Sequence, residues 1–290
     1  MHERTVSSPV PQPVAGLAAL RESYNALLCD VWGVLHNGRQ AFDGAYDCLK
    51  NWRDGGGKVL LLSNAPRPGR TVAAQLDRMG VAGDAFDAVL TSGDVAQQMT
   101  LQRIKDGQRC FHVGPDKDMD LIDDAKIPLS GLEEADFILF TGMYDDDIET
   151  PDDYRDMMAT WQARNLPVLC ANPDRKVQMA DKVIYCAGAV AELYEQAGGE
   201  VVWLGKPYLP VYTQAREKLA AMLDEPKILA VGDGPKTDIP GAANAGLDAL
   251  FISGGLAGAS GHAIDTPEEI AALLAEENTF AHYAMRHLVW

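Results

Sequence analysis

Short apolar runs alternate with helix-length stretches along most of the chain. The runs lie in the segments YNALLCDVW, GKVLLLSNA, FDAVLTSG, QRCFHVG, ADFILFTG, LPVLCANP, EVVWLGKP, PKILAVGDG and LDALFISGG. Between them lie stretches that favour helices, such as residues 68–80 and 208–223. Near-continuous apolar strands that alternate with helices are typical of a parallel sheet covered on both faces. The pattern therefore predicts an α/β fold.

Polar residues end several of these predicted strands. Right-handed crossovers bring the carboxyl ends of parallel strands to one edge of the sheet, where open α/β sheets bind their ligands. One polar residue at a strand end is more often an ordinary loop residue or a helix cap, but several in this order form a more specific pattern. The residues concerned are Asp30, Ser63, Asn64, Lys206, Asp233 and, five residues later, Asp238.

The order of the segments predicts an inserted second domain. Residues 97–203 contain their own predicted strands and helices, and they separate the segment of Ser63 from that of Lys206. The first residues, MHERTVSSPVPQPVAG, hold three prolines and favour a flexible lead-in. We therefore expect a lead-in at 1–18, a core domain at 19–96 and 204–290, and an insertion at 97–203.

The charge of the chain restricts its partners. The 290 residues include 42 acidic and 25 basic side chains, which gives a formal net charge of −17. Such a charge repels nucleic acid and anionic lipid, so neither is an expected general partner. A site for an anionic substrate must then be locally positive or must bind a cation.

Cysteine usage and hydropathy bear on the location of the protein. The five cysteines are odd in number, widely spaced and without a CxxC pair, which favours reduced thiols in the cytoplasm over disulfides or a zinc site. The N-terminus lacks the apolar segment of a signal peptide, and no run of 18 apolar residues could span a membrane. We therefore expect a cytoplasmic protein.

The residues at the strand ends suit phosphoryl transfer. A carboxylate such as Asp30 can attack phosphorus and form an aspartyl phosphate, provided that positive charge offsets the repulsion of the phosphate. Lys206 is a fixed cation, and Asp233 together with Asp30 would recruit Mg²⁺, which prefers oxygen ligands. Ser63 can donate its hydroxyl to phosphate oxygens. Asp238 is placed to accept from a metal-bound water or to hold the loop.

Four segments resemble the motifs of the haloacid dehalogenase superfamily. They are DVWGVL, LLSNA, GKP and GDGPKTD, and the insertion and the CANPD stretch at 170–174 resemble class IIA, a group that includes sugar, nitrophenyl and pyridoxal phosphatases. The resemblance covers roughly residues 24–255. It implies a Rossmann-like core with a large α/β cap of the C2 type, and an Mg²⁺-dependent phosphatase of a small organic phosphate such as a sugar phosphate. Pairing through the caps, and hence a homodimer, is a further implication.

The resemblance also assigns roles to the matching residues. Asp30 would be the nucleophile, and the backbone carbonyl of Trp32 would join Asp233 as a magnesium ligand, with Asp238 nearby. Ser63 and Lys206 would hold the phosphate. The remaining contacts to phosphate and substrate are expected from Asn64, Trp32, Asn172, Pro173 and Asp174.

Trp32 departs from the pattern of this superfamily. Its phosphatases carry a second aspartate at this position, which protonates the leaving oxygen and later activates water. Indole cannot exchange protons in that role, although its N–H can donate a hydrogen bond. Either another group such as His36 supplies the proton, or the leaving group needs none, or the protein turns over slowly or not at all. A large aromatic ring could also stack on a flat substrate.

Two rival functions follow from this departure. One is a weak or non-turnover protein that binds a phosphorylated metabolite. The other is dehalogenation, since the haloacid dehalogenases also carry an aromatic residue here and need no magnesium. The charge argument disfavours dehalogenation, because Asp233 and Asp238 would then lie uncompensated near a third carboxylate.

Overall fold

The computed structural model describes residues 9–179, 182–255 and 266–290, and the chain divides into two compact units. The first unit comprises Met1–Leu62, Gln75–Ala88 and Ala215–Trp290. The second comprises Ser63–Ala74 and Val89–Gln214. The second unit thus contains the whole of the predicted insertion, and the boundaries 97–203 for a separate cap stay a prediction.

The larger sheet has seven strands in the order β1-β13-β12-β11-β2-β3-β4. Its described pairs, from β1–β13 to β2–β3, are parallel, which confirms the predicted α/β class. The strands are β1 (Gln12–Pro13), β2 (Ala26–Asp30), β3 (Lys58–Ser63), β4 (Ala88–Thr91), β11 (Ile228–Gly232), β12 (Asp248–Ile252) and β13 (Tyr283–Met285).

The central strands of this sheet are buried on both faces. Every residue of β2 and β11 is buried, as is every residue of β3 except Lys58, which explains why these runs are almost entirely apolar. Helix α8 packs against β11 and β12. The helices that this unit contains or shares are α1 (Ala45–Asp54), α2 (Gly69–Arg78), α7 (Leu209–Ala220), α8 (Asp238–Asn244) and α9 (Pro267–Glu276).

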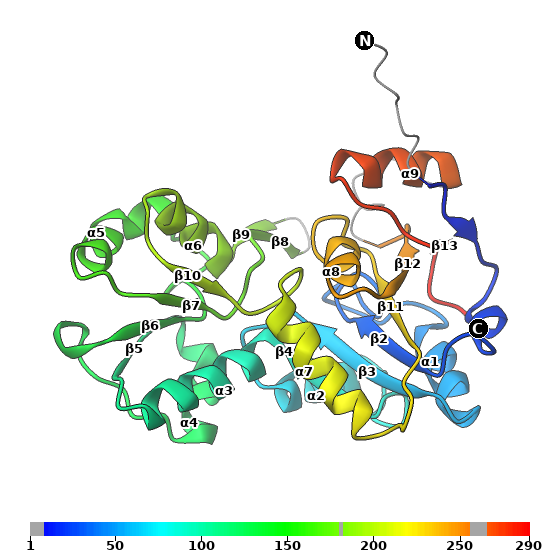
Figure 1. Cartoon of the computed structure of the whole chain (residues 1–290), viewed down its shortest axis with the longest axis horizontal. Helices are drawn as coiled ribbons and strands as arrows, with labels where there is room; N and C mark the ends of the chain where they lie inside the picture. The colour runs from blue at the N-terminus through cyan, green and yellow to red at the C-terminus, as the bar shows by residue number, and fades with distance from the viewer. Residues whose placement is uncertain (1–8, 180–181, 256–265) are drawn as a thin grey trace, which may run out of the picture. The chain divides into compact units, whose positions relative to one another are not determined.

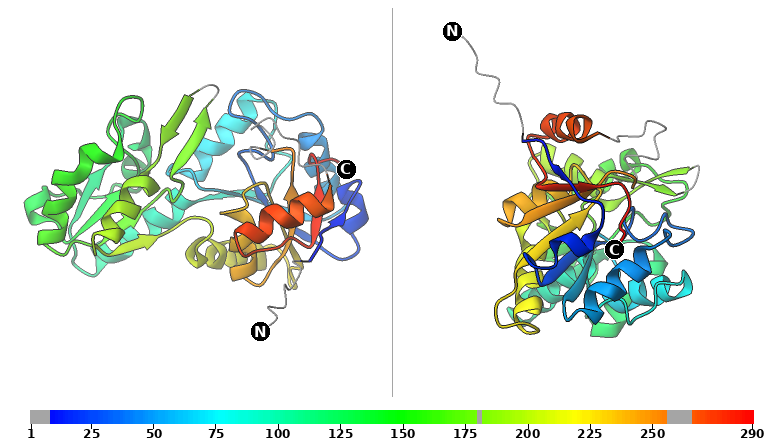
Figure 2. Two further views of the ribbon diagram at one scale, coloured as in Figure 1. Left: turned by 90° about the horizontal axis from the view of Figure 1, so that it is seen from above. Right: turned by 90° about the vertical axis from the view of Figure 1, so that its right-hand side faces the viewer.

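Both chain ends contribute to the β13 end of this sheet. Residues 1–8 of the predicted lead-in lie outside the described residues, whereas β1 pairs with β13 and the short 3₁₀ helix η1 (Leu17–Leu20) buries Leu17. Helix α9 lies near β13, as Figure 2 shows. Thr266 caps α9 by accepting from the N–H of Glu269, and Pro267 fits the first turn.

The second unit has a parallel four-stranded sheet in the order β10-β7-β6-β5. In Figure 1 it lies between α5 and α6 on one side and α3 and α4 on the other. Its strands are β5 (Cys110–Val113), β6 (Phe137–Phe140), β7 (Val168–Cys170) and β10 (Val201–Trp203), with a separate hairpin of β8 (Lys176–Met179) and β9 (Lys182–Tyr185). Its helices are α3 (Ser92–Lys105), α4 (Asp120–Ala125), α5 (Arg155–Ala163) and α6 (Ala187–Gln196), with 3₁₀ turns η2 (Asp116–Asp118), η3 (Leu132–Glu134) and η4 (Pro151–Tyr154).

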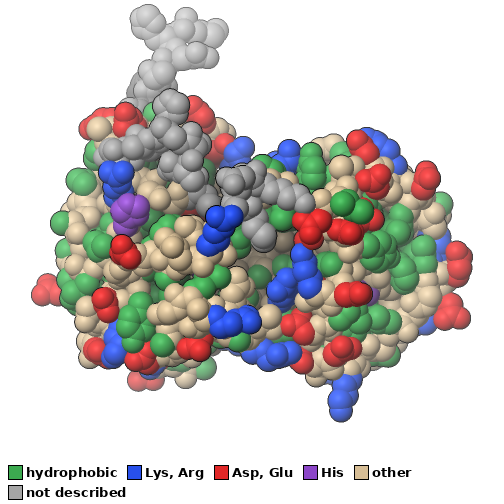
Figure 3. Space-filling model, turned by 180° about the vertical axis from the view of Figure 1, so that it is seen from behind, with side chains coloured by type: hydrophobic (Ala, Val, Ile, Leu, Met, Phe, Trp, Pro, Cys, Tyr) green, Lys and Arg blue, Asp and Glu red, His purple; other side chains and the backbone are tan. Residues whose placement is uncertain are grey.

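Three global expectations can be compared with the structure. All five cysteines are buried, and none of them forms a disulfide. Among the described residues, no helix combines the length and the apolar character that crossing a bilayer requires. On the face drawn in Figure 3, acidic and basic side chains are interspersed, although the chain as a whole is strongly acidic.

Candidate active site

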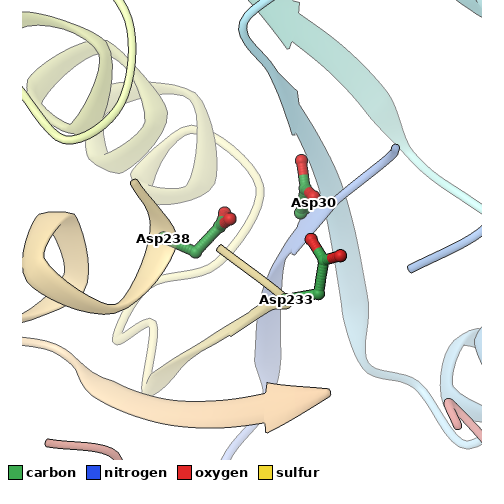
Figure 4. A group of neighbouring side chains, drawn as sticks. All are labelled: Asp30, Asp233 and Asp238. Carbon is green, nitrogen blue, oxygen red and sulfur yellow. The ribbon is translucent and has the colours of Figure 1, made fainter. Parts of the chain in front are cut away.

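Three buried carboxylates meet in the first unit. Asp30, Asp233 and Asp238 are 6%, 4% and 6% exposed, and each offers an oxygen within 4.8 Å of the others. Figure 4 shows the carboxylates of Asp30 and Asp233 facing one another, with that of Asp238 turned toward the same region. The structure thus brings together three of the residues that the sequence placed at strand ends.

Strand register explains this meeting. Strands β2 and β11 are parallel neighbours, with Cys29 opposite Val231, so both strands end at the same level of the sheet. Asp30 is the last residue of β2, and Asp233 directly follows β11. Asp238 opens α8, and its Oδ2 accepts from the N–H of Gly234 at 3.1 Å and from the hydroxyl of Thr237 at 3.2 Å. Asp238 therefore also holds the turn between β11 and α8.

Two glycines form walls around Asp233. A Cβ atom on Gly33 or on Gly255 would overlap the carboxylate of Asp233. Gly33 also has a φ of 90°, in the region that favours glycine. These contacts were not predicted from the sequence. The signal was a glycine three residues after β2 and a Gly-Gly pair after β12, but such glycines are more often simple turn residues.

The cluster fits a divalent cation. Three carboxylates this close and this buried repel one another unless a proton or a cation offsets their charge. Mg²⁺ and Ca²⁺ both prefer oxygen ligands, and two or three carboxylates are a usual protein contribution to such sites. The donor set is thus suited to a hard divalent ion, whereas the backbone carbonyl of Trp32 as a further ligand stays a prediction.

The side chain of Trp32 packs against the loop that follows it, which includes His36 and Gly38. The rings of Trp32 and His36 are 5.3 Å apart at an interplanar angle of 69°, and a Cβ on Gly38 would overlap the six-membered ring of Trp32. The N–H of Gly33 donates to the carbonyl of His36 at 2.9 Å and closes the turn. The Nε1 atom of Trp32 is buried, and it has no hydrogen-bond partner among the described residues.

His36 is held as a neutral acceptor. Its side chain is 2% exposed, and its Nδ1 accepts from the N–H of Gly38 at 2.9 Å. Burial lowers the pKa of His36 below its ordinary value. This hydrogen bond requires an unprotonated Nδ1, so the neutral ring carries its proton on Nε2. The geometry therefore disfavours His36 as a ready source of a proton.

The predicted phosphate-binding residues belong to the second unit. Ser63 is the last residue of β3, and it directly follows Leu62, which pairs in register with Asp30. The Ser63 hydroxyl accepts from the N–H of Ala65 at 3.2 Å, and its hydrogen can still serve as a donor. Lys206 lies three residues after β10 and is 3% exposed. A joint role of Ser63 and Lys206 with Asp30 stays a prediction.

Asn64 and Asp174 are brought together in this unit. The Nδ2 atom of Asn64 donates to Oδ1 of Asp174 at 2.8 Å and to the carbonyl of Lys206 at 3.1 Å. Its Oδ1 accepts from the N–H of Lys206 at 2.7 Å. The side chain of Asn172 accepts from the N–H of Asp174 at 3.1 Å and shapes the loop after β7. The sequence pointed to each of these residues, but not to their contacts.

Comparison with known proteins gives the relatives of the chain. Residues 27–128 match the family described as haloacid dehalogenase-like hydrolase, and residues 203–276 match a second family described as HAD-hydrolase-like. A solved hydrolase of the haloacid dehalogenase-like family from Brucella suis 1330 is 37% identical. The match covers 96% of this chain and 100% of that one, with a TM-score of 0.80.

Two relatives carry names that state a substrate. Ribonucleotide monophosphatase NagD of Escherichia coli (strain K12) is 27% identical over 236 residues, which is 79% of this chain and 88% of that protein. A glycerol phosphate phosphatase from Mycobacterium tuberculosis, solved in complex with magnesium, has a TM-score of 0.66. It is 24% identical, and the match covers 82% of this chain and 70% of that one, so it supports the fold alone.

Proposed function

This chain belongs to the haloacid dehalogenase-like hydrolase family, and we propose from that premise that it is a magnesium-dependent phosphohydrolase of small organic phosphates. The observation that carries the proposal is the buried cluster of Asp30, Asp233 and Asp238 at the end of β2 and β11. A buried set of carboxylates suits a divalent cation, and a carboxylate beside such a cation can approach an anionic substrate.

Asp30 is the proposed nucleophile. One of its carboxylate oxygens attacks phosphorus, a new P–O bond forms, and the bond from phosphorus to the leaving oxygen breaks with its electron pair staying on that oxygen. Water then attacks the phosphorus of the aspartyl phosphate, which releases inorganic phosphate and restores Asp30. In this proposal Ser63 donates its hydroxyl hydrogen to a phosphate oxygen, and Lys206 offsets the charge.

Asp30 and Asp233 would hold Mg²⁺, with the carbonyl of Trp32 as a further proposed ligand. When bound, the ion supplies positive charge that offsets the repulsion between the substrate and the carboxylates. Asp238 would complete the cluster while its Oδ2 keeps the turn after β11 in place. Gly33 and Gly255 leave room for Asp233 to adopt the position that this arrangement requires.

The substrate class is proposed from the relatives. Two of them are named for ribonucleotide monophosphates and for glycerol phosphate, which are small phosphorylated metabolites. We extend that class, and no single member of it, to this chain. The insertion at 97–203, with the loop of Asn172 and Asp174, is the proposed cap that selects the organic part of the substrate. A cytoplasmic location is proposed as well, and it is supported by five cysteines that form no disulfide.

Trp32 and His36 both bear on which leaving group the proposed reaction can release. A positioned acid typically contributes about 10²–10⁴-fold to such a step. Trp32 has no exchangeable acid, and the Nδ1 of His36 is committed to Gly38. These two observations favour substrates whose leaving group departs as a stable anion, such as acyl or aryl phosphates. The same observations support the second candidate function, a phosphometabolite-binding protein with slow or no turnover.

A screen of phosphorylated metabolites tests the proposal. The expected result is phosphate release that requires Mg²⁺ and that Asp30→Asn abolishes. Release that Asp30→Asn leaves unchanged, or no release from any metabolite, would remove the proposed activity. Binding of a metabolite without turnover would instead favour the second candidate. Halide release from a haloacid in the absence of Mg²⁺ would favour dehalogenation, which the three neighbouring carboxylates make the least favoured alternative.

A further inference from the structure

We propose that Asn64 is a positioning residue, which fixes the backbone of Lys206 relative to the side chain of Asp174. The sequence suggested that Asn64 contacts phosphate directly. Its contacts point to a different role, because they join two loops of the second unit that follow different strands, β7 and β10. The kinetic consequence of this role rests on the proposed function, whereas the structural link itself does not.

The hydrogen bonds of Asn64 occupy both of its N–H groups. One N–H donates to Oδ1 of Asp174 at 2.8 Å and the other to the carbonyl of Lys206 at 3.1 Å, while Oδ1 of Asn64 accepts from the N–H of Lys206 at 2.7 Å. A side-chain amide has two N–H donors and one oxygen. Asn64 could therefore donate to a phosphate only if one of these bonds were broken.

The orientation of the amide is determined by its partners. Lys206 presents both its N–H and its carbonyl to Asn64, so exchanging the oxygen and nitrogen of the amide would place donor against donor and acceptor against acceptor. The third partner, Asp174, can only accept when ionised. All three contacts thus require the same orientation, as expected of a side chain that is 7% exposed and fixed in place.

Packing around Asn64 supports this role. A Cβ atom on Gly205, directly before Lys206, would overlap the amide oxygen of Asn64 and would lie 2.7 Å from Cδ of Pro173. Pro173 in turn precedes Asp174. The glycine of the GKP segment is therefore explained by the close approach of these two loops. A displacement of Asp174 would be transmitted through Asn64 to Lys206, which the proposed function places at the phosphate.

Amide hydrogen exchange at Lys206 tests the link without any assay of activity. The N–H of Lys206 donates to Asn64, so its exchange rate reports how firmly Asn64 is held. We expect Asp174→Ala to speed this exchange roughly 3- to 10-fold, because Asn64 loses one of its three bonds. We expect Asp174→Asn to keep the rate within about twofold, because its amide oxygen can still accept from Asn64.

Ser92→Ala is the matched control. The hydroxyl of Ser92 also joins two loops, since it lies within hydrogen-bond distance of the carbonyls of Ala65 and Ala171, and neither of these hydrogen bonds involves Asp174 or Lys206. We expect it to leave the Lys206 amide unchanged. An Asp174→Ala rate equal to wild type, or an equal increase in Ser92→Ala, would overturn the proposal. Asp174→Ser, whose hydroxyl is shorter than the carboxylate, repeats the test if Asp174→Ala does not fold.

A double-mutant cycle separates positioning from direct phosphate contact. If Asn64 acts through its link to Asp174, the loss in kcat/KM for Asn64→Ala with Asp174→Ala together equals that of the more damaging single variant. Direct contact of Asn64 with phosphate predicts that the two losses multiply, which would overturn the proposal. A wild-type protein without Mg²⁺-dependent hydrolysis would refute the proposed function and leave the exchange experiment decisive for Asn64.

Discussion

At the scale of single residues, Trp32 is the position that decides what this site can do. Asp30, two residues earlier, is the buried last residue of β2. The ring of Trp32 packs against His36 and Gly38 in the loop after this strand. Its buried Nε1–H, without a hydrogen-bond partner among the described residues, can donate to an oxygen but cannot release a proton. The proposed nucleophile and the proposed cation site thus stand without the usual acid at position 32.

Trp32→Asp should raise the rate of phosphate release. We expect a gain of about 10²-fold or more for alkyl phosphates, whose leaving oxygen needs a proton, and a smaller gain for aryl phosphates. The measurement is kcat/KM for the two classes in wild type and variant. Trp32→Phe is the control, because it keeps an aromatic ring without adding an acid. Equal rates in wild type and Trp32→Asp would contradict the account of the missing acid.

His112 should make stability depend on pH. Burial lowers the pKa of His112 from 6.5 to about 4, and its Nε2 lies 2.9 Å from Oγ1 of Thr141. Between these two pKa values the unfolded chain binds more protons than the folded protein, so stability falls as the pH falls from about 7 towards 4. The drop attributable to His112 between pH 7.5 and 4.5 should be roughly 2 to 3 kcal/mol.

Denaturant unfolding of wild type and His112→Gln at pH 7.5 and 4.5 measures this contribution. The variant can keep a hydrogen bond to Thr141 but has no titrating ring, so its stability should fall less over this range. Burial raises the pKa of Asp118, which acts in the opposite direction, but this effect is present in both proteins and cancels. Parallel pH curves for the two proteins would show that His112 is not titrating as expected.

At the scale of elements, hydrophobic patterning predicts most of the fold. Every apolar run quoted from the sequence contains a strand, and the predicted helices at 68–80 and 208–223 match α2 and α7. Runs that are buried on both faces give a strong signal because nearly every residue must be apolar. The two-residue β1, the pair β8–β9 and the three-residue β13 were not predicted, because none of them lies in a continuous apolar run of the sequence.

The candidate site is predictable in a similar way. Parallel strands bring Asp30 and Asp233 to one edge, so their meeting follows from topology once the strands are known. The contacts of Asn64 and the walls formed by Gly33 and Gly255 depend on the paths of loops. No periodicity encodes such paths, so the sequence could identify these residue types but not the atoms that they approach.

Gly255→Ala should damage the cation site. A methyl group at this position would overlap the carboxylate of Asp233 and displace it from Asp30. We expect magnesium affinity to fall at least about tenfold, because one ligand of the cluster is moved. The measurement is the Mg²⁺ concentration that gives half-maximal stabilisation or activity. Gly83→Ala is the control, since its methyl group would meet nothing within 4 Å; equal affinities in the two variants would contradict this reading of Gly255.

At the scale of the whole molecule, the acidic balance leaves two clusters among the described residues that could attract a cation. One is the buried set of Asp30, Asp233 and Asp238, and the other is Asp145–Asp147, where only Asp146 is not exposed. In both, the ligand atoms lie within 4.8 Å of one another. Water screens the repulsion among exposed carboxylates, so a metal ion relieves less repulsion there than it does among buried carboxylates. The proposed functional ion therefore belongs to the buried cluster.

Magnesium should therefore stabilise the fold through the first unit. At 100 times the dissociation constant, the free energy of unfolding should rise by about 2.7 kcal/mol. Thermal unfolding with and without Mg²⁺ measures the effect. Asp233→Asn should reduce it strongly, whereas Asp145→Asn, in the exposed cluster, should leave it unchanged. If Asp145→Asn abolished the effect and Asp233→Asn did not, the stabilising ion would bind at the exposed cluster, which would contradict the proposed function.

The most direct measurement of the central claim is to trap the phosphorylated carboxylate. Excess protein is mixed with Mg²⁺ and an aryl phosphate, quenched in acid within one turnover and reduced with borohydride, which converts an acyl phosphate to an alcohol. Because Trp32 cannot activate water, the intermediate should accumulate. The account predicts homoserine at position 30, found by peptide mass spectrometry only when both Mg²⁺ and substrate are present. Phosphate release at the same rate with Asp30 unmodified, or modification of another residue, would contradict it.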